Sequence, residues 1–305
     1  MLSDDLRDEL AAIAPEQECD RLAELSGLFH VAGSAHLRGR GAVDVHLDLA
    51  SSAVARRAFA LLRSLDVDSE IRTYQRAAFD RATRYQLHVE GTPHAYETLH
   101  RAGVLDASHR PVDRPPRRVL ARHCCRRSYL RGALMGAGSL SGPRHPHLEI
   151  RTAEIEGAQF LADVGEREGA HLHVLDRGRH AVAYAKGTET IADVLVAAGA
   201  VDVVLALEER SIVAATRADA NRLANADHAN LVRTSRAAHA QLEAVRRLEE
   251  DGALDGLSPE LREVADLRLR HPTLSIAELA SRCRPPATKA AAYRRLRRLQ
   301  ALADR

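Results

Sequence analysis

The spacing of apolar residues predicts two successive series of helices and strands. Runs with apolar side chains three or four residues apart indicate helices, and runs that alternate apolar and polar residues indicate half-buried strands. Residues 42–49 alternate in this way, and residues 52–65 show helical spacing. Each series predicts the order helix, strand, helix, strand, strand, helix. A further strand near residues 35–40 would complete an αββαββα order in the first series.

The predicted elements have similar lengths in both series. Ser3 is expected to cap the first helix, and Thr188 or Thr190 the last. A connector rich in Pro and Arg, residues 106–119, separates the two series. The predicted helices cover residues 3–13, 19–31, 52–65, 93–102, 121–137, 154–168 and 188–198. The predicted strands cover residues 42–49, 68–74, 84–89, 147–152, 171–175 and 180–184.

One short segment occurs twice, about a hundred residues apart. Residues 25–34 read Leu-Ser-Gly-Leu-Phe-His-Val-Ala-Gly-Ser, and residues 130–139 read Leu-Arg-Gly-Ala-Leu-Met-Gly-Ala-Gly-Ser. A glycine inside a helix costs about 1 kcal/mol relative to alanine. Small residues allow helix backbones to approach closely, so we expect the first glycines of both copies to lie where two helices cross. The last glycine of each copy is expected to end its helix.

From Val201 onward the pattern is entirely helical, with a polar interruption. Residues 221–230 hold three asparagines and an arginine. Asparagine is a weak helix former and prefers caps. These side chains therefore indicate a hydrogen-bond network, a ligand or phosphates, or else ordinary caps and turns. The residues are Asn221, Arg222, Asn225 and Asn230.

The last 49 residues predict three helices with a short second one. Ser258-Pro259 begins the first, Ser275 and Glu278 have the spacing of a capping box, and Thr288 is expected to cap the third. A short helix, a tight turn and an Arg-rich third helix are typical of a helix-turn-helix.

Charge supports a DNA-binding role for this region. The whole chain carries a net charge of +2, whereas from Leu257 onward eleven Lys and Arg face five Asp and Glu. On a recognition helix the first residues would contact bases and the rest phosphates. The alternative is a solvated basic helix. The candidate DNA-binding residues are Ser275, Thr288, Lys289, Tyr293, Arg294, Arg295, Arg297 and Arg298.

A second basic cluster begins in the connector and continues into the helix predicted after it. It is either a solvated face beside a linker or a stripe that contacts phosphates, because clustered arginines release condensed counterions. Arg126 and Arg127 are its candidate phosphate or network residues. The full cluster comprises Arg114, Arg117, Arg118, Arg122, Arg126, Arg127 and Arg131.

The spacing of the cysteines and the length of the apolar runs argue against a zinc protein, a disulfide-bonded protein and a membrane protein. Four cysteines show no CxxC spacing, and adjacent Cys124 and Cys125 make a poor disulfide. We therefore expect reduced thiols and no zinc site. No apolar run is long enough to span a membrane, and the first nine residues are too charged for a signal peptide. A soluble, cytoplasmic protein without a membrane partner is expected.

The repeated segment resembles the LAGLIDADG motif of homing endonucleases. In that family two motif helices pack together, and an acidic residue before the last glycine of each helps to bind a divalent metal. Here those positions hold Ala32 and Ala137. Alanine offers no oxygen ligand, so the resemblance implies the scaffold without its metal site. We expect no catalytic residue, no bound metal and no cofactor.

The whole combination resembles the WhiA family, which joins a degenerate LAGLIDADG pair to a C-terminal helix-turn-helix. The resemblance implies a nucleoid-associated bacterial transcription regulator, not an enzyme, acting in cell division, chromosome segregation and, in sporulating bacteria, sporulation. Its implied partners are double-stranded DNA at promoter regions and a sigma factor or another regulator. The matching stretches are Tyr129–Ala133, Gly138-Ser139, His147–Ile150, Asn221–Asn225, Ala229-Asn230, Leu267-Arg268, His271-Pro272, Ser275–Leu279 and Arg294–Leu299.

The third helix departs from that family. The usual Ser-Lys-Ser is Thr288-Lys289-Ala290 here, and the usual Asn-His pair is Tyr293-Arg294. Thr288 still suits a cap, and Lys289 can still reach a phosphate. The family's base preference is therefore not carried over to this chain.

The expected fold class is α+β: a pseudo-twofold pair of αββαββα repeats, residues 1–105 and 106–200, then a helical connector, 201–256, and a helix-turn-helix, 257–305. Two other functions stay open. One is a metal-dependent endonuclease that uses the nearby carboxylates Asp44 and Asp48. The other is an effector-binding sensor, suggested by the Asn-rich stretch. Weaker DNA binding after Arg294→Ala with Arg295→Ala is the outcome expected of a regulator.

Overall fold

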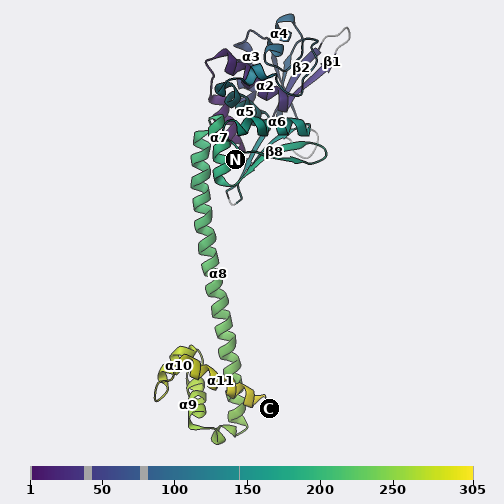
Figure 1. Cartoon of the computed structure of the whole chain (residues 1–305). Helices are drawn as coiled ribbons and strands as arrows, with labels where there is room; N and C mark the ends of the chain where they lie inside the picture. The colour runs from purple at the N-terminus through teal and green to yellow at the C-terminus, as the bar shows by residue number, and fades with distance from the viewer. Residues whose placement is uncertain (1, 38–42, 76–81, 144, 305) are drawn as a thin grey trace. The chain divides into compact units, whose positions relative to one another are not determined.

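The computed structural model describes residues 2–37, 43–75, 82–143 and 145–304 (Figure 1). Contacts divide the chain once, into a first unit, Met1–Ala215, and a second unit, Thr216–Arg305. Each unit has its own hydrophobic core. The finer division predicted from the sequence, with boundaries after residues 105, 200 and 256, stays a prediction. The two αββαββα repeats share one core, so contacts alone do not separate them.

The first unit confirms the predicted pair of repeats. Each repeat forms a four-stranded antiparallel sheet, in the orders β1-β2-β4-β3 and β5-β6-β8-β7. The first repeat, preceded by α1 (Leu2–Ala12), comprises α2 (Glu18–Ala32), β1 (Gly33–Leu37), β2 (Val43–Leu49), α3 (Ser52–Arg63), β3 (Glu70–Gln75), β4 (Thr83–Val89) and α4 (Pro93–Arg101). The second comprises η2 (Arg117–Leu120), α5 (His123–Ala137), β5 (Gly138–Ser141), β6 (His147–Thr152), α6 (Ile155–Glu166), β7 (His173–Asp176), β8 (Ala181–Lys186) and α7 (Thr188–Ala198).

Helices α2 and α5 are the repeated segments, and their glycines meet as predicted. A Cβ atom on Gly27 would lie 2.2 Å from the carbonyl oxygen of Tyr129, and one on Gly132 would lie 2.2 Å from that of Glu24. Any side chain at either position would push the backbones apart. The two halves of the unit are therefore joined where the helices cross at glycine.

The strands that directly follow these helices, β1 and β5, were the hardest to place from sequence. The pattern suggested a strand near residues 35–40, whereas β1 ends at Leu37 and residues 38–42 lie outside the described chain. It suggested no strand at β5. Gly33 and Gly138 do end their helices, but with extended backbone, because each is also the first residue of a strand.

Two predicted caps are wrong. Ser3 lies inside α1, where its hydroxyl donates to the Leu140 carbonyl oxygen (2.9 Å) and accepts from the Leu140 amide (2.8 Å). Ser3 therefore binds α1 to strand β5 instead of beginning a helix. Thr188 is the first residue of α7, and the capping position belongs to Gly187, whose φ of 85° favours glycine.

Helix α8 (Val201–Glu250) runs through the Asn-rich stretch without a break, and from Thr216 onward it belongs to the second unit. There it joins η3 (Ala253–Gly256), α9 (Pro259–Arg270), α10 (Ile276–Arg282) and α11 (Lys289–Ala303). Val245 and Leu248 of α8 lie in one core with Val264, Leu279 and Leu296. The end of α8 is therefore a structural part of the helix-turn-helix unit.

Candidate nucleic-acid interface

The caps of α10 and α11 fix the turn between them. The Ser275 hydroxyl accepts from the Glu278 amide (3.3 Å), and the Glu278 carboxylate accepts from the Ser275 amide (2.8 Å), which confirms the predicted capping box. The Thr288 hydroxyl accepts from the Ala291 amide (3.2 Å), as predicted. The side chains of Ser275 and Thr288 thus define where each helix begins.

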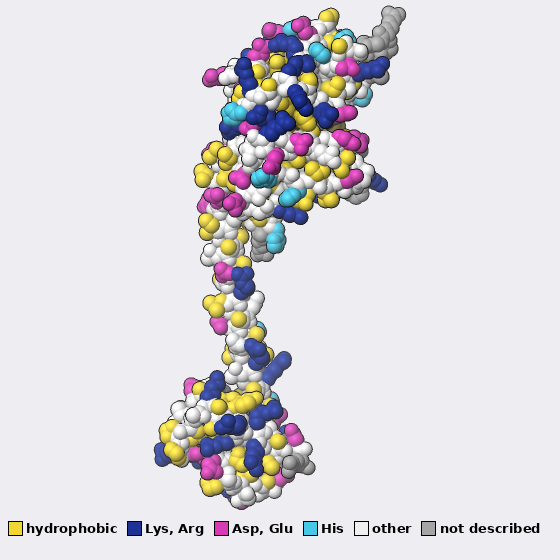
Figure 2. Space-filling model, viewed as in Figure 1, with side chains coloured by type: hydrophobic (Ala, Val, Ile, Leu, Met, Phe, Trp, Pro, Cys, Tyr) yellow, Lys and Arg dark blue, Asp and Glu magenta, His cyan; other side chains and the backbone are white. Residues whose placement is uncertain are grey.

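Helix α11 has one apolar face and one basic face. Ala292, Leu296 and Leu299 are buried in the core of the second unit. The side chains on the other face are exposed, and Figure 2 shows Lys and Arg side chains on the visible surface of this unit. Within the described chain, no hydrogen bond or ion pair engages the lysine or the three arginines on the exposed face of α11. The exposed face comprises Lys289, Tyr293, Arg294, Arg297 and Arg298.

Arg295 differs from its neighbours on α11. It is half-buried on the side toward α9, near Glu260 and Cys283. The pKa of Glu260 is lowered by its own backbone amide and the Ser258 hydroxyl, with a smaller contribution from the Arg295 charge. Part of the Arg295 charge is therefore directed at this acid, and Arg294 is the better probe of an external ligand.

Arg268 was counted among the eleven Lys and Arg from Leu257 onward, but it does not contribute to the basic surface. Its side chain is only 1% exposed, and it donates to the carbonyl oxygens of Leu274 (2.8 Å) and Pro272 (3.3 Å) and to Gln241 Oε1 (2.8 Å). Burial lowers its pKa. Arg268 therefore ties the turn after α9 to α8 and adds nothing to the basic surface. Its helical spacing from Leu261 and Val264 is the sequence signal that could have revealed this.

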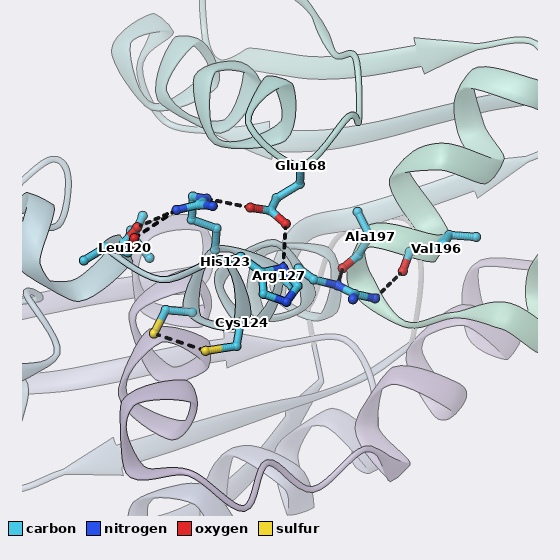
Figure 3. Close-up of polar contacts among 10 residues, drawn as sticks. Leu120, His123, Cys124, Arg127, Glu168, Val196 and Ala197 are labelled. Carbon is cyan, nitrogen blue, oxygen red and sulfur yellow. Dashed lines mark hydrogen bonds and ion pairs between the residues drawn. The ribbon is translucent and has the colours of Figure 1, made fainter.

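Arg126 and Arg127 are both engaged inside the first unit, and Figure 3 shows the contacts of Arg127. Arg126 donates to the Glu168 carboxylate (2.6 Å) and to the carbonyl oxygen of Ala121 (3.1 Å). Arg127 donates to the carbonyl oxygens of Ala197 (2.8 Å) and Val196 (3.0 Å), at the last turn of α7. Cations suit that end of a helix. The geometry favours a network over phosphate binding for both arginines.

Arg131 belongs to a buried ion network that sequence reasoning did not find. Its Nε donates to the carboxylate of Glu24 (2.7 Å), and Arg57 Nε donates to the same carboxylate (2.8 Å). The Glu24 side chain is fully buried and the two arginine side chains nearly so. This network links α3, α2 and α5, so Arg131 is removed from the proposed phosphate stripe.

The exposed arginines of the connector remain as a second basic surface. Arg114, Arg117 and Arg118 line a groove of about 530 Å³ together with Arg167. Figure 2 shows Lys and Arg gathering on the visible face of the first unit. Arg118 also donates to the His100 carbonyl oxygen (3.0 Å). Asp163 lies in the same groove, which moderates its positive charge.

The asparagines of α8 are exposed along the helix surface. Arg222 pairs with Asp219, and Arg233 donates to Asn230, both one turn apart. For Asn221 and Asn225 no hydrogen bond of the side chain is seen in the described chain. A hydrogen-bond network that joins the four residues, one of the alternatives predicted, is therefore not seen, and the side chains of Asn221 and Asn225 are exposed on the helix.

The alternative endonuclease site is not assembled. Ala32 lies against Gly136, where the motif helices end. Asp48 accepts from Tyr74 (3.1 Å) and Asp44 accepts from the Gly91 amide (3.3 Å). The Cα atoms of these residues, four apart on β2, are about 13 Å apart, and each carboxylate is directed to a different partner, so they do not form a shared metal site. Within the described ranges, the metal-ligating side chains that gather do so elsewhere, at Cys19, Asp20, Cys124 and Cys125.

Comparison with known proteins identifies the family. The chain is 38% identical over 300 residues to "Probable cell division protein WhiA" of Symbiobacterium thermophilum, covering 97% of this chain and 95% of that protein. The chain belongs to the WhiA family. A second relative of the same name, from Heliobacterium modesticaldum, is 34% identical over 98% of this chain and 94% of its own length.

Three family models match successive parts of this WhiA-family chain. They are described as the WhiA N-terminal LAGLIDADG-like domain (residues 18–105), the WhiA LAGLIDADG-like domain (126–217) and the WhiA C-terminal HTH domain (220–303). The crystal structure of full-length DUF199/WhiA from Thermatoga maritima shows the same fold, with a TM-score of 0.57 and 24% identity over 99% of this chain and 97% of that one.

No helix in the described chain is both long and apolar enough to cross a bilayer. Even the 50-residue α8 interrupts its apolar residues with charged ones.

Proposed function

We propose that this WhiA-family protein is a regulator that binds double-stranded DNA at promoter regions, with α11 as the recognition helix. The observation that carries the proposal is the exposed basic face of α11, whose cations have no partner within the described chain, opposite a face buried in the core. A helix of this kind fits the major groove, where its first residues can reach base edges.

The residues on that face divide by position. Lys289 and Tyr293, in the first two turns, are proposed to approach bases with Arg294. Arg297 and Arg298, in the next turn, are proposed to contact phosphates. Ser275 and Thr288 act by fixing the helix starts, and the half-buried Arg295 is proposed to contribute less than its exposed neighbours.

The first unit is proposed to assist DNA or protein binding without cleaving DNA. Its motif helices end in Ala32 and Ala137, and the two nearby carboxylates do not form a shared metal site. The exposed Arg114, Arg117 and Arg118 offer it a surface for phosphates. A sigma factor or another regulator is the proposed protein partner, and genes of cell division, chromosome segregation and sporulation are the proposed targets. The cytoplasmic nucleoid is the proposed location.

A fluorescence-anisotropy titration tests this function. The full chain is titrated into genomic promoter duplexes and a scrambled duplex of the same length, at several salt concentrations. Binding to some promoters that stays tighter than to the scrambled duplex as salt rises is the expected result. If the protein bound every duplex equally and this binding disappeared as salt rose, the protein would only contact phosphates without sequence preference. Incubation of the same duplexes with Mg²⁺ and Mn²⁺ is expected to leave them uncut.

A further inference from the structure

Three cysteines and one aspartate meet where the two motif helices begin. Cys19 and Asp20 are the second and third residues of α2, and Cys124 and Cys125 are the second and third residues of α5. The two helices have equal lengths and a constant offset of 105 residues. The four side chains thus occupy equivalent positions in the two repeats.

The spacing of their donor atoms fits a tetrahedral metal. All four ligand atoms lie within 4.8 Å of one another. The two sulfurs of Cys124 and Cys125 are 3.9 Å apart, and the Cys19 sulfur is 3.6 Å from Asp20 Oδ1. Zinc–sulfur bonds of about 2.3 Å place tetrahedral ligands about 3.8 Å apart. The longest separation needs to shorten by only about 1 Å.

We propose that Cys19, Cys124, Cys125 and Asp20 bind one zinc ion, or a similar thiophilic divalent cation, which clamps the starts of α2 and α5 together. Three sulfurs and one oxygen fill the four positions that zinc takes in structural sites. Such a clamp would lie at one end of the helix pair, complementing the glycine crossing. It is independent of the proposed DNA-binding function, because its ligands are in the first unit and the recognition helix is in the second.

The surroundings act in both directions on the ligand charges. The hydrogen bond with Asp20 raises the pKa of Cys124 and burial raises the pKa of Cys125, whereas the helix ends and a nearby arginine favour negative charge. Each pair lies in the first turn of its helix, where unpaired backbone amides and the helix dipole carry partial positive charge. Arg122 Nη1 lies 4.0 Å from the Cys19 sulfur. Binding would release three thiol protons and leave three thiolates and one carboxylate on a divalent ion. The resulting complex carries two negative charges, which Arg122 and the helix ends partly offset.

The ligand-bearing turns are held in place by other contacts. At the start of α5, the Glu168 carboxylate accepts from Arg126 (2.6 Å) and pairs with His123 (3.3 Å), as Figure 3 shows beside Cys124. At the start of α2, Glu18 pairs with Arg101. A preorganised ligand set of this kind needs little rearrangement to accept a metal.

Sequence spacing alone argued against zinc because it shows no CxxC pair. The fold brings together residues 105 positions apart, which spacing within one segment does not reveal. The fourth cysteine, Cys283, lies in the second unit, where its thiol is buried and donates to the Leu279 carbonyl oxygen (3.5 Å). It provides a matched control for every cysteine substitution.

Metal analysis of the full chain tests the proposal. The protein is purified under reducing conditions, loaded with zinc, freed of excess metal by gel filtration and measured by inductively coupled plasma mass spectrometry. One zinc per chain and a thermal midpoint several degrees above that of the chelator-treated protein are expected. Replacement by Co²⁺ should give thiolate-to-metal charge-transfer bands and the visible spectrum of a tetrahedral site.

Variants then assign the ligands. Cys19→Ser and Cys125→Ser should each lower cobalt affinity at least tenfold and reduce the charge-transfer intensity by about one third, since one of three thiolates is lost. Asp20→Asn should weaken cobalt binding but leave the thiolate charge-transfer bands in place. Cys283→Ser should change neither the cobalt affinity nor these bands. Circular dichroism and DNA binding show whether each variant is still folded. Since Cys19 is half-buried and Cys125 is buried, Cys19→Ser is expected to disturb the fold less than Cys125→Ser.

Several outcomes would overturn the proposal. One is a reduced wild-type chain that retains no zinc and gives no thiolate–cobalt band. Another is Cys19→Ser binding metal as tightly as wild type, or Cys283→Ser abolishing binding. A third is mass spectrometric detection of a stable disulfide within the cluster that forms in preference to the zinc complex under mild reduction, which would make it a redox pair.

Discussion

Helices α5 and α11 are both rich in arginine, and they use it in opposite ways. On α5, Arg126, Arg127 and Arg131 all donate to partners within the first unit, and Arg131 is buried against Glu24. On α11, Arg294, Arg297 and Arg298 are exposed and form no ion pair in the described chain. A run of arginines in sequence therefore does not distinguish a structural network from a binding surface. Neighbouring carboxylates and carbonyl oxygens decide between them.

The largest expected effect comes from breaking the buried network. Glu24→Ala would leave two buried arginines, Arg57 and Arg131, without their carboxylate. Removing one partner of a buried ion pair destabilises a protein by about 3–5 kcal/mol. We expect the free energy of unfolding of the first unit to fall by that amount, measured by urea denaturation.

The matched control is Glu18→Ala, which breaks an exposed pair with Arg101 at the start of the same helix. Exposed pairs contribute about 0–1 kcal/mol. Equal losses for the two variants would mean that the Glu24 network contributes no more than a surface contact. DNA binding by the Glu24 variant, measured where it is still folded, should stay at the wild-type level.

The sequence predicted the frame of both regions well. Periodicity gave the order helix, strand, helix, strand, strand, helix in both series and missed the strand β5. Gly27 and Gly132 pointed correctly to a close helix crossing. The caps Ser275 and Thr288 were also predictable, since they act within four residues. Local patterns thus carried the parts of the fold that depend on local contacts.

Long-range partners were beyond such patterns. Ser3 looked like a cap because nothing near it reveals Leu140, 137 residues away. Arg131 and Arg268 looked like surface charge, although buried acceptors hold both. The grouping of Cys19 and Asp20 with Cys124 and Cys125 was missed for the same reason. Which cations face solvent is a property of tertiary packing, and residue counts overestimated the basic surface.

The second-largest effect is expected on DNA binding, when two arginines of α11 are replaced. Arg297→Ala with Arg298→Ala should weaken DNA binding about equally for all sequences, because these residues are assigned to phosphates. Each lost phosphate contact should reduce the slope of log affinity against log salt by about 0.9. Anisotropy titrations at four or more salt concentrations measure this slope.

The control pair is Arg126→Ala with Arg127→Ala on α5. Since both side chains are held inside the first unit, this variant should lose stability while its salt slope stays near the wild-type value. A reduced slope for the α5 pair and an unchanged one for the α11 pair would reverse the assignment of the two helices.

The smallest expected effect is on the pH dependence of stability. It comes from a histidine that is buried without a carboxylate as hydrogen-bond partner. His30 of α2 donates from Nδ1 to the Ser26 carbonyl oxygen (2.7 Å), and its Nε2 is buried with no side-chain partner in the described chain, close to the backbone of Val112. Burial lowers the pKa of His30, with weaker opposing effects from backbone carbonyls and Asp113. A proton on this ring would add a buried positive charge. Unlike the charge of Arg131, it would have no carboxylate as hydrogen-bond partner.

The sign of the pH dependence follows from that lowered pKa. Below about pH 6.5, the ordinary value for His, the unfolded chain binds a proton that the folded chain excludes, so stability falls as pH falls until the folded pKa is reached. The slope for one proton is at most about 1.4 kcal/mol per pH unit. His30→Gln should therefore lose less stability than wild type between pH 7.5 and 5.5 in urea denaturation. His145→Gln, at an exposed position, should follow the wild-type curve. Parallel curves for all three proteins would show that His30 takes up its proton equally well in the folded state.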